Sequence, residues 1–516
     1  MRNIFATIFL VSLFTLSRAQ SKKDSVYSYT IDHHLVERSL LRPAFLQRDS
    51  LMSYGDVRVA YQMNKGGFRK AQQAYNGGTT SFQANGFNRL GKFLLGAKFT
   101  FNSIREDSLA NSLRSGLEDL SPYYPYANKS GDYQRQNYQL NASLGYELAH
   151  SVQPFLQVDY HRHWSAGTVD PRLKSNRFTL KVKPGVSLNF SKSTLGLYGI
   201  IGRADENVSL LYKNMDFQSS NLYPDRMYYM NYGYGTARQK DTTRVNFKYD
   251  NYKGVGIQYL KKLYSWHTKT EIEYQQYHNT NQNYSRKSVL YSGPLAIYDQ
   301  NTIKFFVDAV KYNGDQGQQL LIFDGEYNKG VDGNKLTTGS LNKVNYKVST
   351  LSLTGQYVKL WHRHHQLAKE LGFVVTYYTE NRKDLLQAID FEVGQMRVEP
   401  SLRLYLQKSS TKLIQFAFAP YATIPTETTL EYSPLSINTF IQNVVFWDYY
   451  YYKTQYLGAK FGVEYKDRFW GNDLAFYAKL DLRKSSGTVE LKDDIKPKFL
   501  STGSRTNMEI GIRLSL

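Results

Sequence analysis

The chain has 516 residues, a formal net charge of +21, 44 tyrosines and no cysteine, and its mean hydropathy is −0.52. The low hydropathy excludes a protein built from many membrane-spanning helices. An aromatic content of 15% excludes a disordered chain, because such chains are poor in aromatic residues. The lack of cysteine excludes disulfide frameworks, cysteine-ligated zinc and cysteine nucleophiles. On length alone, the chain could form two or three domains or one large closed sheet.

The N-terminus has the pattern of a secretory signal peptide. Arg2 supplies a short basic region, residues 4–16 are mostly apolar, and Ser17-Arg18-Ala19 matches the small-x-small cleavage pattern. The apolar run is too short to span a membrane, and a polar stretch follows it. We therefore predict a signal peptide over residues 1–19, with a buried N-terminal helix as the alternative. Residues 20–54 show little alternation and are predicted to form a periplasmic or plug-like segment.

From residue 55 onward, apolar and polar residues alternate. In the segment 177–190, Phe178, Leu180 and Val182 fall on one parity, and Lys181 and Lys183 fall on the other. Side chains alternate across a strand, so this pattern predicts a strand with one apolar and one polar face. The pattern recurs over 92–102, 138–148, 156–163, 397–406, 474–483 and 507–516. The predicted strands of about 11–17 residues exceed the length needed to cross a bilayer.

Short and long connections also alternate along the chain. Tight connections are predicted near 89–91, 150–152, 191–193, 263–265, 314–316 and 408–410, and long polar loops near 103–133, 165–176, 206–250, 280–300, 328–342, 382–392, 426–452 and 486–504. Short periplasmic turns and long extracellular loops are typical of transmembrane barrels. We predict an all-β fold over residues 55–516, an antiparallel up-and-down transmembrane β-barrel of about 18 strands, with 14–16 left open. A soluble β-sandwich or propeller is the alternative.

One group of side chains has the residue types of a metal site. Asp159, His161 and His163 lie at alternate positions of a predicted strand and therefore point to one side, the lumen. Imidazole and carboxylate groups suit zinc, copper or iron. The alternative is a pair of solvated histidines on a polar face. A second site is predicted at His362, His364 and His365 in a periplasmic connection.

The polar strand faces carry many basic residues. The predicted lumen cations are Lys98, Lys181, Lys183, Arg403, Lys460, Lys479 and Arg483. They could attract anions to the lumen, although Asp159, Glu399, Glu464, Asp481 and Glu509 share that face, and compensating pairs are the alternative. Removal of Arg2 and Arg18 with the signal peptide lowers the charge from +21 to +19. Such a charge also suits lipopolysaccharide phosphates, whereas nucleic acid is not an expected partner of an exported barrel.

An aromatic cluster, Trp447-Asp448-Tyr449-Tyr450-Tyr451-Tyr452-Lys453, precedes a predicted strand. Such a cluster suits a membrane girdle, packing within a loop, or a surface on which a ligand stacks. Girdle and packing are the favoured interpretations.

The chain resembles a family of uncharacterised outer-membrane β-barrel proteins of Gram-negative bacteria. The resemblance lies in Arg42-Pro43-Ala44-Phe45, in Asp170-Pro171-Arg172 before a long strand, and in the alternating final strand that ends at Leu516. The family usually has Asn-Pro-Ala-Phe at the first motif, where this chain has Arg42. Outer-membrane barrels commonly end in an aromatic residue that the assembly machinery reads, and this chain ends in Leu516 instead. The resemblance implies an outer-membrane location and a barrel fold, with insertion by the barrel-assembly machinery.

We therefore expect an outer-membrane barrel that acts as a channel or as an accessory barrel for uptake of a small solute. About 18 strands would leave a lumen wide enough for water unless it is plugged. The alternative is a structural or docking barrel that works with a surface lipoprotein, a transporter or a secretion component. No nucleophile elbow, zinc-protease motif or P-loop is present in the sequence. We therefore expect no enzymatic activity and no cofactor, and a lipid-modifying barrel enzyme is the alternative.

Overall fold

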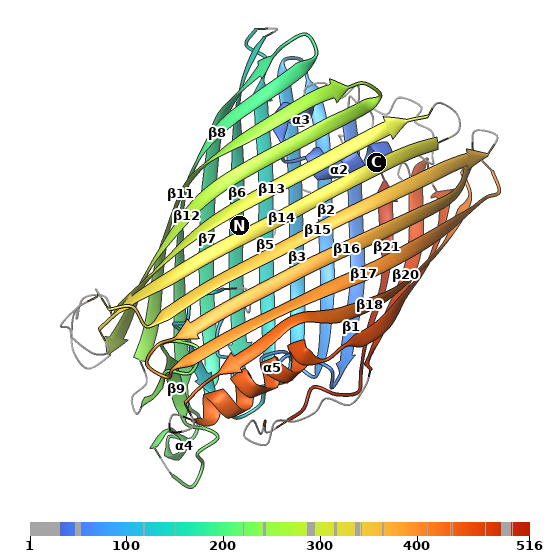
Figure 1. Ribbon diagram of the computed structural model, residues 1–516. Coiled ribbons are helices and arrows are strands. Elements are labelled where there is room, and N and C mark those ends of the chain that lie inside the picture. Colours follow the sequence, from blue (N-terminus) through green and yellow to red (C-terminus); the bar gives the residue numbers. More distant parts are fainter. Residues whose placement is uncertain are drawn as a thin grey trace.

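Figure 1 shows the computed structural model of the chain. The structure describes residues 31–46, 53–116, 119–149, 151–219, 221–240, 244–285, 295–313, 317–335, 341, 343–363, 366–409, 411–433, 435, 437–469, 471–486, 497 and 499–515. The predicted signal peptide, residues 1–19, lies outside the described residues, as do His364, His365 and Leu516.

Eighteen antiparallel strands form one closed sheet, which confirms the predicted fold class and strand number (Figure 1). Each strand pairs with the barrel strands that precede and follow it in the chain. The strands are β1 (Ser53–Gly66), β2 (Asn76–Leu90), β3 (Phe93–Leu109), β5 (Gly131–Tyr146), β6 (Val152–Gly167), β7 (Arg172–Asn189), β8 (Ser193–Leu211), β11 (Arg244–Leu263), β12 (Trp266–Ser285), β13 (Ala296–Tyr312), β14 (Gly317–Asn334), β15 (Tyr346–Arg363), β16 (Gln366–Asp384), β17 (Ile389–Gln407), β18 (Leu413–Glu431), β19 (Tyr456–Phe469), β20 (Asn472–Ser485) and β21 (Ser504–Ser515).

The first and last strands close the barrel. β1 pairs with β2 on one side and with β21 on the other. The register of β1 with β21 runs from Asp56 opposite Ser515 to Gly66 opposite Arg505. A sheet closed in this way leaves no edge of unpaired backbone groups, which is what a sheet in a bilayer requires.

Along each strand, side chains point alternately to an outer apolar face and an inner polar face. Ile257 in β11 and Ile272 in β12 have 48% and 53% of their surface exposed, whereas the adjacent Gln258 and Glu273 are buried on the inner side. Lipid contacts the outer face of such a barrel. The low mean hydropathy follows because only every second strand residue is apolar. Among the described residues, no helix is both long enough and apolar enough to span a membrane.

Tight turns join the strands at one end of the barrel and longer connections join most of them at the other. The predicted turns near 89–91, 191–193 and 263–265 are found between β2 and β3, β7 and β8, and β11 and β12.

The strands extend further toward the long-loop end than the sequence predicts. β11 and β12 each have 20 residues. The predicted long loop 382–392 is wrong, because β16 and β17 are joined by residues 385–388 alone, with Ala388 in the left-handed region at a φ of 50°. The loop predicted at 165–176 likewise shrinks to 168–171. These polar segments form strands because the sheet protrudes beyond the lipid, where both of its faces can meet water.

The long connections fold into a cap over the lumen (Figure 1). Its elements are a three-stranded sheet of β4 (Pro125–Ala127), β9 (Tyr228–Asn231) and β10 (Ala237–Lys240), the short helix α4 (Asp216–Ser219), and the π-helical η5 (Ile441–Val445), which continues into α5 (Phe446–Lys453). Phe68, Tyr126 and Phe440, from three different connections, share one buried core with Trp447 and Tyr450 of α5. The aromatic cluster 447–453 is therefore loop packing and not a membrane girdle.

Two short helices lie inside the barrel near the tight-turn end. They are α2 (Ile31–Ser39) and α3 (Pro43–Leu46). Backbone oxygens of their connection accept hydrogen bonds from inward side chains of the wall, Leu40 O from Ser143 Oγ at 3.2 Å and Leu41 O from Gln157 Nε2 at 2.6 Å. We call residues 31–46 the plug. The boundaries predicted for this segment, 20–54, stay a prediction.

Candidate functional site

Arginines of the plug bind carboxylates of the barrel wall. Arg38 Nε lies 2.9 Å from Asp308 Oδ1 in β13, and Arg38 Nη2 lies 2.8 Å from Asp324 Oδ1 in β14. Arg42 Nε lies 2.6 Å from Glu271 Oε2 in β12. The Asp308 side chain is only 1% exposed. These ion pairs fix the plug against one sector of the wall.

An aromatic contact supports the same docking. The ring of Phe306 in β13 has the guanidinium carbon of Arg38 at 4.4 Å and that of Arg42 at 3.8 Å from its centroid. Phe45 of α3 stacks on it at 6.1 Å. Arg42 and Phe45 are the first and last residues of the Arg-Pro-Ala-Phe motif, so this motif is a docking element of the plug. Cation–π contacts of this kind are strongest where water is excluded.

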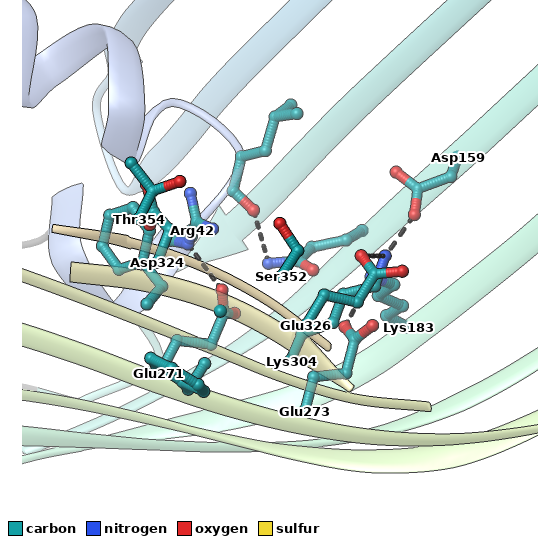
Figure 2. A pocket seen from close by; sticks show the side chains of 15 residues that line it. Arg42, Asp159, Lys183, Glu271, Glu273, Lys304, Asp324, Glu326, Ser352 and Thr354 are labelled. Atoms are coloured by element: carbon teal, nitrogen blue, oxygen red, sulfur yellow. Dashed lines mark hydrogen bonds and ion pairs between the residues drawn. The ribbon is translucent and has the colours of Figure 1, made fainter. Parts of the chain in front are cut away.

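A cavity of about 420 Å³ lies between the plug and the wall. Figure 2 shows its side chains, which come from the plug connection and from strands β6, β7, β12, β13, β14 and β15. Its charged lining residues are Arg42, Asp159, Lys183, Glu271, Glu273, Lys304, Asp324 and Glu326. Five carboxylates therefore face three cations. Ser352 and Thr354 add hydroxyl groups on β15.

The charges around the cavity pair across the lumen. Lys183 Nζ lies 2.8 Å from Glu273 Oε2 and 3.4 Å from Asp159 Oδ2. Lys304 Nζ lies 3.3 Å from Glu326 Oε2 (Figure 2). Tyr198 Oη donates to Glu273 at 3.0 Å. A polar solute in this cavity would meet both donors and acceptors, which is the arrangement that fixes orientation in small-molecule sites.

Most of the predicted lumen cations have partners on the inner face. Lys183, Arg403, Lys460 and Lys479 form ion pairs with Glu273, Glu370, Glu399 and Glu509 at 2.8, 2.8, 2.8 and 3.1 Å. Lys181 donates to Gln275 Oε1 at 2.9 Å and lies 4.1 Å from the centroid of the Tyr252 ring. Lys98 and Arg483 form no ion pair within the described part of the chain. Attraction of anions by the whole set stays a prediction.

The structure does not bring the predicted metal ligands together. Asp159 accepts a hydrogen bond from Asn141 at 2.8 Å and pairs with Lys183. His163 Nδ1 lies 2.5 Å from Asn137 Oδ1. Among the described residues, no three His, Cys, Asp or Glu side chains are grouped as a metal ion requires. A metal at Asp159, His161 and His163 therefore stays a prediction without a ligand cluster. His364 and His365 of the second predicted site are not described.

A second network of charges joins the cap to the wall. Arg177 Nη2 of β7 lies 2.7 Å from Asp250 Oδ2 of β11, and its Nη1 lies 3.2 Å from Glu206 Oε2 of β8. Lys248 Nζ lies 3.2 Å from Asp119 Oδ2, which belongs to the connection between β3 and β5. Burial alone would raise the pKa of Asp119, but Lys248 and Arg177 outweigh it and lower this pKa to about 2. The ion pair of Asp119 with Lys248 thus holds the connection between β3 and β5 against the wall.

Asp448 of α5 carries a different charge environment. It accepts a hydrogen bond from the Ala71 amide at 2.8 Å. Burial raises the pKa of Asp448 to about 6, against the opposing effect of Lys70 and Arg382, while Glu380 adds to the rise. The contact of α5 with the connection 67–75 therefore changes charge near neutral pH.

Sequence reasoning missed the plug arginine and several wall carboxylates. Arg38, Glu271, Glu273 and Asp308 are not among the predicted site residues, although Glu271 and Glu273 lie at alternate positions of one strand. That spacing places both on one strand face and was an available signal. The partners of these residues could not be predicted from the sequence, because Arg38 and Asp308, for example, are 270 residues apart in the chain.

The closed sheet, its apolar outer face and its polar, occupied lumen define an outer-membrane-type transmembrane β-barrel. Residues 43–516 match the model of a family of unknown function, DUF6850, and the chain belongs to that family. No curated protein matches the chain.

The chain is similar to solved structures at very low sequence identity. The FrpB iron transporter from Neisseria meningitidis is 7% identical, with 91% of this chain and 82% of that one covered and a TM-score of 0.41. BauA, the ferric preacinetobactin receptor from Acinetobacter baumannii, is 6% identical, with 90% and 80% covered and a TM-score of 0.38. Values this low carry no argument about the function of this chain.

Proposed function

We propose that the protein is a gated passage in the bacterial outer membrane for uptake of a small polar solute. The supporting observation is the charged cavity of about 420 Å³ between the plug and the wall, in a barrel whose other end is covered by the cap. Ligand sites in proteins commonly have volumes of about 300–1,000 Å³, so the cavity suits a solute of monosaccharide size.

The two closures are separate pieces of structure. An 18-stranded barrel would otherwise leave an aqueous channel. The plug is held by ion pairs to the wall and by small apolar clusters, in which Leu35, Val36 and Leu40 pack against wall residues. The cap is held by a larger, mainly aromatic core. Passage would require both to move. In the outer membrane the barrel is surrounded by lipid and lipopolysaccharide and is inserted by the barrel-assembly machinery.

Single-channel conductance in planar bilayers tests the passage. The plug is released by Arg38→Ala with Arg42→Ala, and the cap by Val444→Asp, which places a charge in the buried core. The wild type, the plug variant and the cap variant should each open rarely. The combined variant, which carries all three substitutions, should conduct most. Lys383→Ala with Lys412→Ala is the matched control, because it removes two ion pairs away from both closures.

A disulfide lock makes the test specific to the plug. A Cβ placed on Gly196 of β8 would lie 2.8 Å from the Cβ of Ala44 in α3. Disulfides need a separation of about 3.8 Å, so Ala44→Cys with Gly196→Cys requires a small shift. Added to the combined variant, the lock should remove conductance, and reduction should restore it. A folded combined variant that never conducts, or a lock without effect, would reject the passage.

A second candidate function is docking of a surface lipoprotein. The connection 212–227, which contains α4, projects beyond the cap (Figure 1) and exposes Met215, Leu222 and Tyr223, with Leu222 at 84% exposure. Exposed apolar groups gathered in this way suit a protein partner. Leu222→Ser should then abolish co-purification in mild detergent, whereas Tyr264→Ser at a tight turn of the other end should not. Equal capture by both variants would reject this function.

A further inference from the structure

Three arginines meet at the cap end of the lumen. Arg483 lies near the end of β20 and Arg505 near the start of β21, and both are on the inner face of the wall. Arg69 belongs to the connection 67–75 between β1 and β2. Arg483 lies 5.8 Å from the ring of Phe68, which precedes Arg69 in the chain, and Arg505 Nη1 donates to the carbonyl of Ala74 in the same connection at 3.2 Å. The three positive groups therefore share one region. This region is distinct from the cavity beside the plug.

Two of these arginines are direct cross-strand neighbours. Arg483 and Arg505 are register partners in the β20–β21 pair. Like charges placed directly opposite on one face of a sheet destabilise the pairing. Elsewhere on the inner face, the sheet places opposite charges together, as with Lys460 and Glu399 at 2.8 Å. The arginine pair is therefore a cost that a bound anion would remove.

Neutral groups hold the guanidiniums in place. Arg505 Nη2 donates to Asn64 Oδ1 at 2.7 Å, and its Nη1 donates to the carbonyl oxygens of Ala74 at 3.2 Å and Gly66 at 3.3 Å. Carbonyl and amide oxygens orient a guanidinium without neutralising its charge. Arg505 is thus positioned and still fully cationic.

Arg69 and Arg483 are positioned in similar ways. Arg69 Nη1 donates to the carbonyl of Gln73, and its guanidinium lies 4.8 Å from the centroid of the Trp447 ring. The Nε of Arg69 is buried and makes no hydrogen bond. Arg483 lies 5.8 Å from the centroid of the Phe68 ring. Burial lowers the pKa of Arg69, and the nearby Tyr75 and Asp448 oppose this shift.

None of the three arginines forms an ion pair within the described residues. A cluster of oriented guanidiniums with spare donors is the geometry that binds phosphate or carboxylate groups, often through two parallel hydrogen bonds. We propose that Arg69, Arg483 and Arg505 bind the phosphate or carboxylate group of a small anionic solute at the cap end of the lumen. This binding does not depend on the proposed passage.

Isothermal titration of the full-length protein in detergent tests this site. The probes are inorganic phosphate and citrate, with ionic strength held constant by chloride. The wild type should bind at least one of them, and Arg483→Gln and Arg69→Gln should each weaken binding about tenfold or more, as expected for loss of a charge-assisted hydrogen bond. Lys484→Gln is the matched control, because it removes one charge from the adjacent, outward-facing position of β20.

Thermal unfolding gives a second readout that does not require tight binding. Without phosphate, Arg483→Gln should raise the melting temperature, because it removes the repulsion with Arg505. Phosphate should then raise the melting temperature of the wild type by more than that of this variant. Absence of binding, or equal weakening by Lys484→Gln, would overturn the site. Displacement of bound phosphate by lipid A in the micelle would show that a lipid headgroup is the ligand and would overturn the assignment to a solute.

Discussion

Removal of the Arg38 side chain should release the plug from the wall. The variant Arg38→Ala leaves Asp308, which is 1% exposed, without its partner, and also removes the contact with Asp324. Loss of one partner of a buried ion pair costs about 3–5 kcal/mol. Arg38 is itself 21% exposed, so we take the lower end, about 3 kcal/mol. This corresponds to an increase of about a hundredfold in the population of the released plug.

Cysteine labelling measures that population directly. The chain has no cysteine, so Ala44→Cys places a single thiol in the plug at a site with no exposed surface. A polar thiol reagent should label this cysteine about a hundredfold faster when Arg38→Ala is added, provided that closing is faster than labelling. Lys383→Ala, which breaks the exposed pair with Asp390, should leave the rate unchanged.

A double variant distinguishes two effects of Arg38→Ala, the unpaired charge left on Asp308 and the loss of the packing contacts of Arg38. Arg38→Ala with Asp308→Asn removes the buried charge that the single variant leaves behind, so its labelling should be slower than that of Arg38→Ala alone. An unchanged labelling rate in Arg38→Ala, in a protein that still migrates as a folded barrel, would refute the view that these ion pairs hold the plug.

Three further predictions concern the cap. The raised pKa of Asp448, about 6, means that the cap is most stable below the unfolded value near 4 and loses up to about 3 kcal/mol as pH rises from about 4 to about 6. Limited proteolysis between pH 4 and 7 should show this loss in the wild type and not in Asp448→Asn. The lowered pKa of Asp119, about 2, has the opposite sign: its contact with Lys248 is lost as pH falls from about 4 to 2, and Asp119→Asn should increase hydrogen exchange in 110–130 at neutral pH. Phe440→Ala should destabilise the cap by about 3–5 kcal/mol through the cavity left in its core, measured as faster proteolysis of η5 and α5 with the barrel intact.

The barrel could be predicted because its signal is local. The parity of Phe178, Leu180 and Val182 against Lys181 and Lys183 is enough to identify a strand and its two faces, without knowledge of any partner strand. The ends of the strands were less predictable. Beyond the lipid both faces of the sheet meet water, so the strands there lack an apolar face. Asp384 and Ile389 form the last pair of β16 and β17, in a segment whose sequence predicts a polar loop.

The cap and the plug contacts could not be predicted because they join distant parts of the chain. Phe68, Tyr126 and Phe440 meet in one core, and no periodicity links them. The alternation along each strand places Lys183 and Glu273 on the inner face. These residues are 90 positions apart in the chain, and they reach hydrogen-bonding distance only because the sheet closes into a barrel. The lumen cations were therefore identified as a set while their partners were not.

The pairing of β1 with β21 has a consequence for biogenesis. Among the described strands, these two are the only barrel neighbours that are not consecutive barrel strands in the chain, so their meeting is the last step in making the wall. Before that step, the growing sheet carries two rows of unsatisfied amide and carbonyl groups, which invite pairing with other chains. The insertion machinery must shelter both rows until the final strand arrives. A chain cut short before residue 504 would expose β1 and β20 permanently and should be a substrate for periplasmic proteolysis.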